Sequence, residues 1–159
     1  MAPPPKPFED LHAVPIHIRH IEARLELNAA VANARGEALL DFEHGSEDGC
    51  PVFDLRQPIE ELSIDDEPVD VRALFHRDFG GGAWAHLRVI PRLLAAGSRH
   101  RMRIRYAVGH PAVPVVGGRQ PGLDWVPGRR TLPLRLSDLG AGRYLRSWVP
   151  ANLIFNPSR

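Results

Sequence analysis

Apolar and polar residues alternate one by one along much of the chain, which is the pattern of a β-strand with one buried and one solvent-exposed face. The alternation begins at residues 21–31, where every second residue is apolar. It resumes over residues 38–42 after a turn signal at residues 34–36, which predicts a hairpin. We expect the apolar side of the first strand to face the core. Its members are Ile21, Ala23, Leu25, Leu27, Ala29 and Val31.

The clearest amphipathic strand is predicted over residues 101–108. Its apolar side holds Met102, Ile104, Tyr106 and Val108, and its polar side holds Arg101, Arg103 and Arg105. Shorter apolar segments lie at residues 52–55, 59–64, 69–71 and 84–90. About seven to nine short strands with frequent turns are typical of a β-sandwich or barrel. We therefore predict an all-β fold, an antiparallel β-sandwich.

The sequence predicts an arm at the beginning of the chain and one domain in the rest of it. Residues 1–12 carry four prolines and no periodicity, so we expect a disordered, proline-rich arm. Residues 13–159 contain no second domain boundary and no internal repeat, and we expect them to form one domain. Prolines crowd the segment after Gly109, and a weak helical pattern at residues 139–148 predicts a short helical turn.

Composition and charge narrow the functional classes. The chain has 159 residues, 43% of them hydrophobic, with a net charge of +1, which is too balanced for general capture of nucleic acid or an acidic membrane. No apolar stretch is long enough for a membrane-spanning helix, and the first ten residues lack the apolar core of a secretory signal. The single cysteine, Cys50, cannot form an internal disulfide. We expect a cytoplasmic protein that binds neither nucleic acid nor membrane.

Motifs for catalysis and metal binding are missing from the sequence. His17 and His20 are three residues apart, and on a strand this spacing points their rings to opposite sides. The chain has no His-Glu-x-x-His, no Gly-x-Ser-x-Gly and no phosphate-binding loop at residues 80–82. We predict no catalytic residue, no metal site and no cofactor, and hence no enzyme activity from this chain alone.

One basic run and one acidic run remain as candidate binding features. Residues 98–105 contain four arginines and a histidine, and residues 60–70 contain six acidic residues and no basic one. If these strands are neighbours, cross-strand ion pairs explain both runs; otherwise the arginines could bind RNA or an acidic partner. Trp84, Trp125 and Trp148 could instead line a site for a sugar or lipid, or pack beneath loops. The candidate binding residues are Arg101, Arg103, Arg105, Tyr144 and Trp148.

Several segments resemble the N-terminal domain of aminopeptidase N-like zinc metallopeptidases. They are residues 36–42 (GEALLDF), 52–65 (VFDLRQPIEELSID), 87–91 (LRVIP) and 102–106 (MRIRY). Residues 137–155 (SDLGAGRYLRSWVPANLIF) are similar to bacterial peptidase-like relatives. The resemblance implies a saddle-like β-sandwich, which in full-length relatives covers the zinc-bearing catalytic domain. This chain departs from the family by lacking Gly-Ala-Met-Glu-Asn, His-Glu-x-x-His and the amine-binding glutamine, which is absent from residues 147–150.

The resemblance also implies that the chain stops before the last strands of the family's domain, so we expect an exposed sheet edge. Unpaired backbone groups along such an edge can pair with another chain. We therefore expect a non-catalytic module for protein–protein interaction or an accessory part of a peptidase, docking on itself or on a separately encoded catalytic partner. The alternative is a subunit or truncated remnant of an aminopeptidase whose catalytic half is supplied separately.

Overall fold

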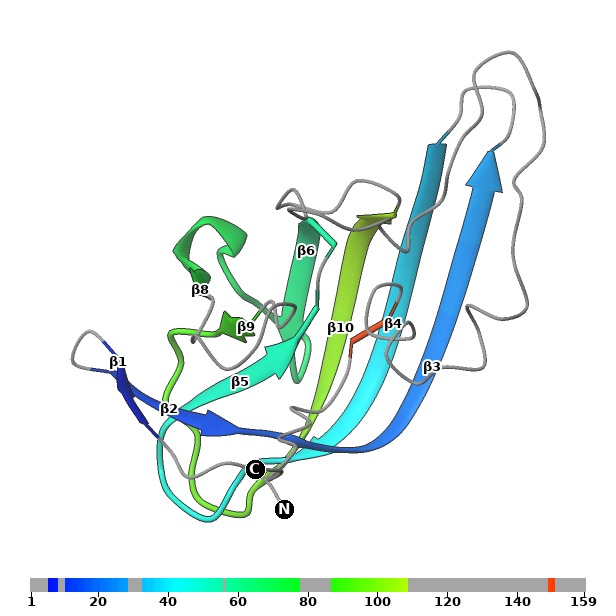
Figure 1. The fold of residues 1–159 in the computed structure, drawn as a ribbon. Helices are drawn as coiled ribbons and strands as arrows, with labels where there is room; N and C mark the ends of the chain where they lie inside the picture. The colour runs from blue at the N-terminus through cyan, green and yellow to red at the C-terminus, as the bar shows by residue number, and fades with distance from the viewer. Residues whose placement is uncertain are drawn as a thin grey trace, which may run out of the picture.

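The computed structural model of the chain describes residues 6–8, 11–28, 33–55, 57–77, 87–108 and 149–150. In these residues the chain forms ten strands and one short 3-10 helix, grouped into two five-stranded sheets (Figure 1). Buried side chains from both sheets make one core, so the predicted all-β, sandwich-like fold is confirmed.

The first sheet, sheet A, is built from short strands in the order β1-β2-β5-β9-β8. Its strands are β1 (Lys6–Phe8), β2 (Leu11–Pro15), β5 (Cys50–Asp54), β9 (Leu87–Val89) and β8 (Phe75–Arg77). Strands β2 and β5 pair in parallel, whereas all other described pairs in both sheets are antiparallel. The chain between β2 and β5 passes through the other sheet, and this crossover is what a parallel pair requires.

The second sheet, sheet B, has longer strands in the order β3-β4-β10-β6-β7. Its strands are β3 (His17–Asn28), β4 (Asn33–Glu43), β10 (Arg99–Val108), β6 (Ile59–Ile64) and β7 (Glu67–Pro68). The predicted hairpin is confirmed by the antiparallel pairing of β3 with β4. The predicted position of its turn is wrong, because residues 34–36 lie within β4 and pair with residues 25–27 of β3. The helix η1 (Val71–Ala73) follows β7, where we had predicted that the returning strand continues.

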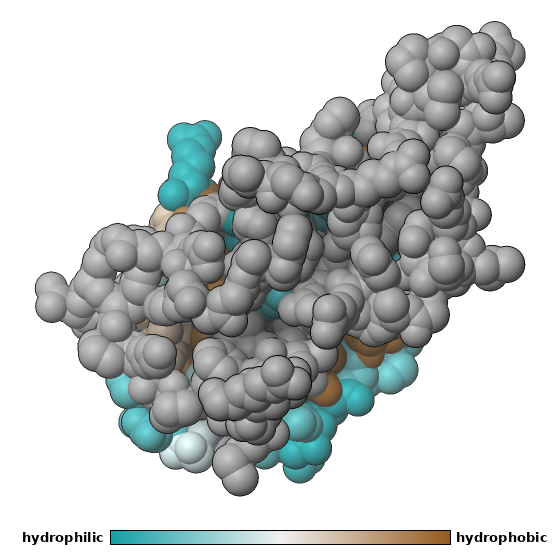
Figure 2. Space-filling model, viewed as in Figure 1, coloured by the Kyte–Doolittle hydropathy of each residue, from teal (hydrophilic) through white to brown (hydrophobic). Residues whose placement is uncertain are grey.

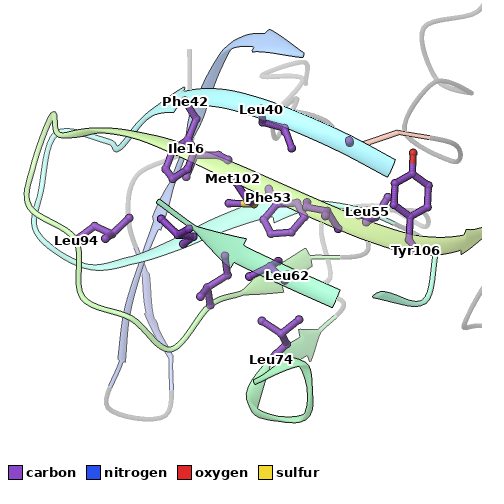
Figure 3. Close-up of a cluster of buried hydrophobic side chains, with 14 of the residues drawn as sticks. Ile16, Leu40, Phe42, Phe53, Leu55, Leu62, Leu74, Leu94, Met102 and Tyr106 are labelled. Carbon is purple, nitrogen blue, oxygen red and sulfur yellow. The ribbon is translucent and has the colours of Figure 1, made fainter. Parts of the chain in front are cut away.

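The core lies where the apolar side of sheet B packs against sheet A (Figure 3). Strand β10 buries every second residue as predicted, and Tyr106 has no exposed surface. Gly36 on β4 lies opposite Tyr106, and a Cβ at Gly36 would sit 2.3 Å from the tyrosine ring. Glycine therefore lets the two backbones approach across this aromatic side chain.

Part of the segment predicted as a mobile arm is in sheet A. Residues 6–8 pair with residues 11–13, and β2 continues to Pro15. A three-residue strand is too short to show alternation, and proline is tolerated in an edge strand because no neighbour needs its missing N–H. The predicted helical turn at residues 139–148 lies outside the described residues, and the extent of the domain over residues 13–159 stays a prediction.

Candidate functional site

The arginine residues predicted for binding lie on the solvent face of sheet B, each beside a carboxylate. Strand β10 places them there because its alternate residues fill the core. Arg101 Nε donates to Asp41 Oδ1 at 2.9 Å, and Arg105 Nη1 donates to Glu61 Oε2 at 3.1 Å. Arg103 Nε lies 3.7 Å from a carboxylate oxygen of Glu37 on β4. Cross-strand pairing was the alternative that we had considered to ligand binding, but only the side chain of Arg105 meets the acidic run at residues 60–70 as predicted. The carboxylates beside Arg101 and Arg103 belong to β4 instead.

The remaining predicted binding residues are Tyr144 and Trp148. Tyr144 and Trp148 lie outside the described residues, and so do Trp84 and Trp125 of the tryptophan hypothesis. Their part in binding stays a prediction.

A surface hollow of about 590 Å³ lies beside β6, β7 and η1. Its charged lining consists of Glu60, Glu61, Asp66, Asp70, Arg72, Arg103 and Arg105. Both signs of charge are mixed there, so the hollow has no single-sign field for steering an anion or a cation. The space-filling view likewise shows described surface that is mostly hydrophilic, with a few apolar residues between (Figure 2).

Ser98, His100 and Asp65 form a hydrogen-bonded row that the sequence did not predict. Ser98 Oγ lies 2.7 Å from His100 Nε2, and His100 Nδ1 lies 2.6 Å from Asp65 Oδ2. The register of β10 against β6 creates this contact, because Met102 faces Ile64 and the following turn reaches back to His100. The order of groups matches that of a serine, a base and an orienting acid in acyl transfer.

The backbone around Ser98 does not supply the other half of such a site. The N–H of Ala96 donates to Asp48 Oδ1, that of Gly97 to Gly45 O, and that of Ser98 to Ala95 O. None of these three amides is left to bind an oxyanion. Ser98 Oγ also lies 2.6 Å from Ala95 O, and its single hydrogen can serve only one acceptor at a time.

The row instead links the turn between β6 and β7 to the turn that precedes β10. Asp65 and Asp66 have φ values of 52° and 64°, as in the tight turn between β6 and β7. Burial alone would raise the pKa of the Asp65 carboxyl, but hydrogen bonds from the Arg101 N–H and from His100, with the charges of His100 and Arg92, lower that pKa overall. The ring of His100 also packs against that of Phe42 on β4, with the ring centroids 5.5 Å apart and the planes tilted by 34°. These contacts fix the ends of three strands of sheet B relative to one another.

The outer edge of β3 is the other unusual feature. Strand β3 has twelve residues and lies at the end of sheet B, with no described strand on its outer side. Figure 1 shows the far half of the β3–β4 hairpin extending away from sheet A. The side of β3 that we predicted to be buried is exposed: Ile21 is 36%, Leu25 39% and Leu27 49% accessible.

The prediction of a buried face on β3 is therefore wrong. Ile21, Leu25 and Leu27 do lie on the core side of sheet B, because they face Leu40, Gly36 and Ala34 of β4. The strands of sheet A have only three to five residues each, so sheet A is too short to cover β3 along its whole length. The described chain has four exposed large hydrophobic residues, namely these three and Leu93.

No group of three or more metal-ligating side chains is gathered in the described residues. The described part of the chain also contains no helix of the length and apolarity that a membrane crossing needs.

No protein-family model and no curated protein matches the chain. Solved structures do: it is similar to an M1 zinc metallopeptidase from Deinococcus radiodurans, with 20% identity over 67% of this chain and a TM-score of 0.41. A mutant of an M1 zinc metallopeptidase from that organism, bound to the substrate Tyr-Ser-Ala, has 19% identity over 64% and a TM-score of 0.38. A mutant two-domain M1 zinc metallopeptidase bound to L-tryptophan has 20% identity over 67% and a TM-score of 0.39.

The chain spans about a quarter of the length of these proteins, 23% to 24% of each. That the matched part is the N-terminal domain stays a prediction.

Proposed function

We propose that this chain is a non-catalytic module that binds a protein partner through the outer edge of β3. An extended segment of the partner would add to sheet B as a further strand beside β3. The observation that carries the proposal is the length and exposure of this edge: twelve residues, of which all but Ile18 are exposed.

The other edges of the described sheets are short. Strands β1 and β8 at the edges of sheet A have three residues each, and β7 at the other edge of sheet B has two. Short edge strands are one way in which proteins avoid pairing with other chains. A β-bulge between Ile18 and His20 disturbs only the beginning of β3, and the register from His20 to Asn28 is regular. The proposed docking edge is therefore the part of β3 after the bulge.

The two faces of β3 define the chemistry of a partner strand. One face presents Ile21, Leu25 and Leu27, and the other presents His20, Glu22, Arg24 and Glu26. A strand paired with β3 meets the same alternation, so it gains most when it too alternates apolar residues with charges of opposite sign. The proposal thus names an extended amphipathic segment of a protein as the occupant.

The absence of catalysis is part of the proposal. The row of Ser98, His100 and Asp65 has the order of a catalytic triad, but the amides of its turn are already used within the protein. Without these amides the row lacks the backbone donors that usually give the largest stabilisation of the transition state. The alternative raised by the resemblance, a peptidase part that needs a separate catalytic half, also stays a prediction.

Binding at the edge can be tested with synthetic strands. Two peptides of about the length of β3 are used, alternating leucine with glutamate and arginine in the two possible orders. We expect one order to shift the backbone amide resonances of β3 in a saturable way, and a peptide with proline at alternate positions to leave them unchanged. Leu25→Asp should weaken the binding, and Leu93→Asp, at an exposed apolar position away from β3, is the matched control. Shifts spread over other strands contradict the proposal, and so does the absence of shifts with either order when the chain is monomeric.

Catalysis is tested on the same purified chain. We expect no hydrolysis of aminoacyl-p-nitroanilides with added zinc, and no hydrolysis of p-nitrophenyl acetate above that of Ser98→Ala. Turnover that disappears in Ser98→Ala would overturn the non-catalytic part of the proposal while leaving the docking edge untouched.

A further inference from the structure

We propose that the partner strand is β3 of a second copy of this chain, paired antiparallel about a two-fold axis at Ala23. This inference rests on the proposed function, because it names the occupant of the same edge. It follows from the order of charges along β3, which complements itself in this register.

In an antiparallel pair of identical strands, the numbers of any two residues that face each other add up to the same total. With Ala23 facing itself, Glu22 faces Arg24 of the other copy and Arg24 faces Glu22. His20 faces Glu26 in the same way. On the apolar side, Ile21 faces Leu25. Every directly opposed pair from His20 to Glu26 is therefore either apolar or of complementary character, and opposite charges at such positions stabilise a sheet.

The two adjacent registers bring like charges together. With Arg24 facing itself, Glu22 meets Glu26 of the other copy. With Glu22 facing itself, His20 meets Arg24. Like charges directly opposite each other destabilise a strand pair, so these registers are disfavoured. A register centred on Leu25 pairs Arg24 with Glu26 but loses the pairing of Glu22 with a cation, since Glu22 then faces Asn28.

In this arrangement the apolar faces of the two β3 strands lie on the same side of the joined sheet. A two-fold axis perpendicular to sheet B puts the core sides of both copies on the same face of one continuous sheet. The exposed residues Ile21 and Leu25 then lie beside their counterparts, which removes part of their surface from water. In the single chain Arg24 Nη2 reaches Glu26 Oε1 at 2.9 Å within the same strand, and both side chains are largely exposed and free to turn toward another strand.

Charge reversal tests the register. Glu22→Arg places arginine opposite Arg24, and Arg24→Glu places glutamate opposite Glu22. We expect light scattering after gel filtration to give twice the chain mass of 17.7 kDa for the wild type. Each variant alone should dimerise at least tenfold more weakly, while an equimolar mixture of the two should recover the dimer, because the new arginine of one chain then meets the new glutamate of the other. A mixture as weak as the single variants contradicts this pairing.

Cross-linking gives an independent test. Across an antiparallel pair, opposed Cα atoms lie about 4.5 or 5.5 Å apart, and both values suit a disulfide. Ala23→Cys should therefore form a disulfide-linked dimer under mild oxidation. Leu25→Cys is the control, because its two copies would lie about 13 Å apart along the strands. Cys50 is buried, and burial raises the pKa of its thiol, so it does not compete. Cross-linking of the Leu25→Cys variant but not of the Ala23→Cys variant overturns the register.

The outcomes separate the inference from the function on which it rests. If the wild type is a monomer while the synthetic strands still shift the amides of β3, the second copy is the wrong partner and the docking edge stands. If the synthetic strands fail as well, both proposals fall. If the wild type dimerises but neither charge reversal weakens the dimer, its interface lies elsewhere and the inference fails.

Discussion

At the scale of single residues, His44 is the least satisfied polar group in the described core. It is 2% exposed, and neither ring nitrogen has a hydrogen-bond partner. Burial lowers the pKa of its imidazole, as does the nearby His100, while the charge of Asp48 and the backbone of Glu47 oppose the shift. The unfolded chain therefore takes up a proton at this residue at a higher pH than the folded chain does.

We predict that His44→Leu reduces the loss of stability on acidification. The His44 pKa is lowered on folding, so the free energy of unfolding is unaffected well above pH 6.5 and falls as the pH drops below that value. Leucine cannot be protonated and leaves no unpaired ring nitrogen. Urea unfolding at about pH 7.5 and pH 5 measures the effect, with His17→Leu as an exposed control. Equal pH dependence in His44→Leu and the wild type would contradict this account.

At the scale of elements, alternation in the sequence identified strands and hairpins but not their surroundings. The buried side of β10 was predicted residue by residue, since only a strand places Met102, Ile104 and Tyr106 together. On β3 the same reasoning failed, because a two-residue period separates two faces without saying whether a second sheet covers either. The parallel pairing of β2 with β5 depends on the path of the chain and has no local signal.

The candidate sites also divide into features that the local sequence predicts and features that depend on how distant strands pair. The carboxylate beside Arg105 could be anticipated, because it belongs to the acidic run at residues 60–70. Those beside Arg101 and Arg103 could not, because they come from β4, whose place next to β10 we had not predicted. The row of Ser98, His100 and Asp65 could not, since it joins residues 35 apart through the register of two strands. The spacing of Ser98 and His100, which puts both on one face of a strand, was the available signal.

The arginine face of β10 gives a prediction at this scale. Replacing Arg101, Arg103 and Arg105 by serine should leave the fold intact, because the buried side of the strand is unchanged. Exposed ion pairs contribute about 0.2–1 kcal/mol each, so we expect a modest fall in the free energy of unfolding. Circular dichroism and urea unfolding test this, with Met102→Ser as a core variant that should lose more. Loss of folded structure in the triple variant would mean that these pairs are essential to the sheet.

At the scale of the whole molecule, the two sheets are joined by a core and by one buried cation. Arg88 on β9 is 1% exposed. Burial lowers the pKa of its guanidinium to about 10, although the negative charge of Asp54 raises that pKa. Its Nε donates to Leu55 O at 2.9 Å and its Nη2 donates to Gln57 O at 3.1 Å. Leu55 and Gln57 belong to the segment in which the chain leaves β5 of sheet A for β6 of sheet B. Arg88 therefore holds the crossing between the layers.

Removing this cation should destabilise the whole sandwich rather than one strand. Arg88→Met keeps the length of the side chain but removes the hydrogen bonds to Leu55 O and Gln57 O and the positive charge near the buried Asp54. Breaking a buried charged contact in this way costs about 3–5 kcal/mol, a large part of the stability of a small domain. Urea unfolding should show this loss, whereas Arg103→Met on the exposed face should change stability by about 0.5 kcal/mol at most. Equal midpoints for the two variants would mean that the core alone holds the layers together.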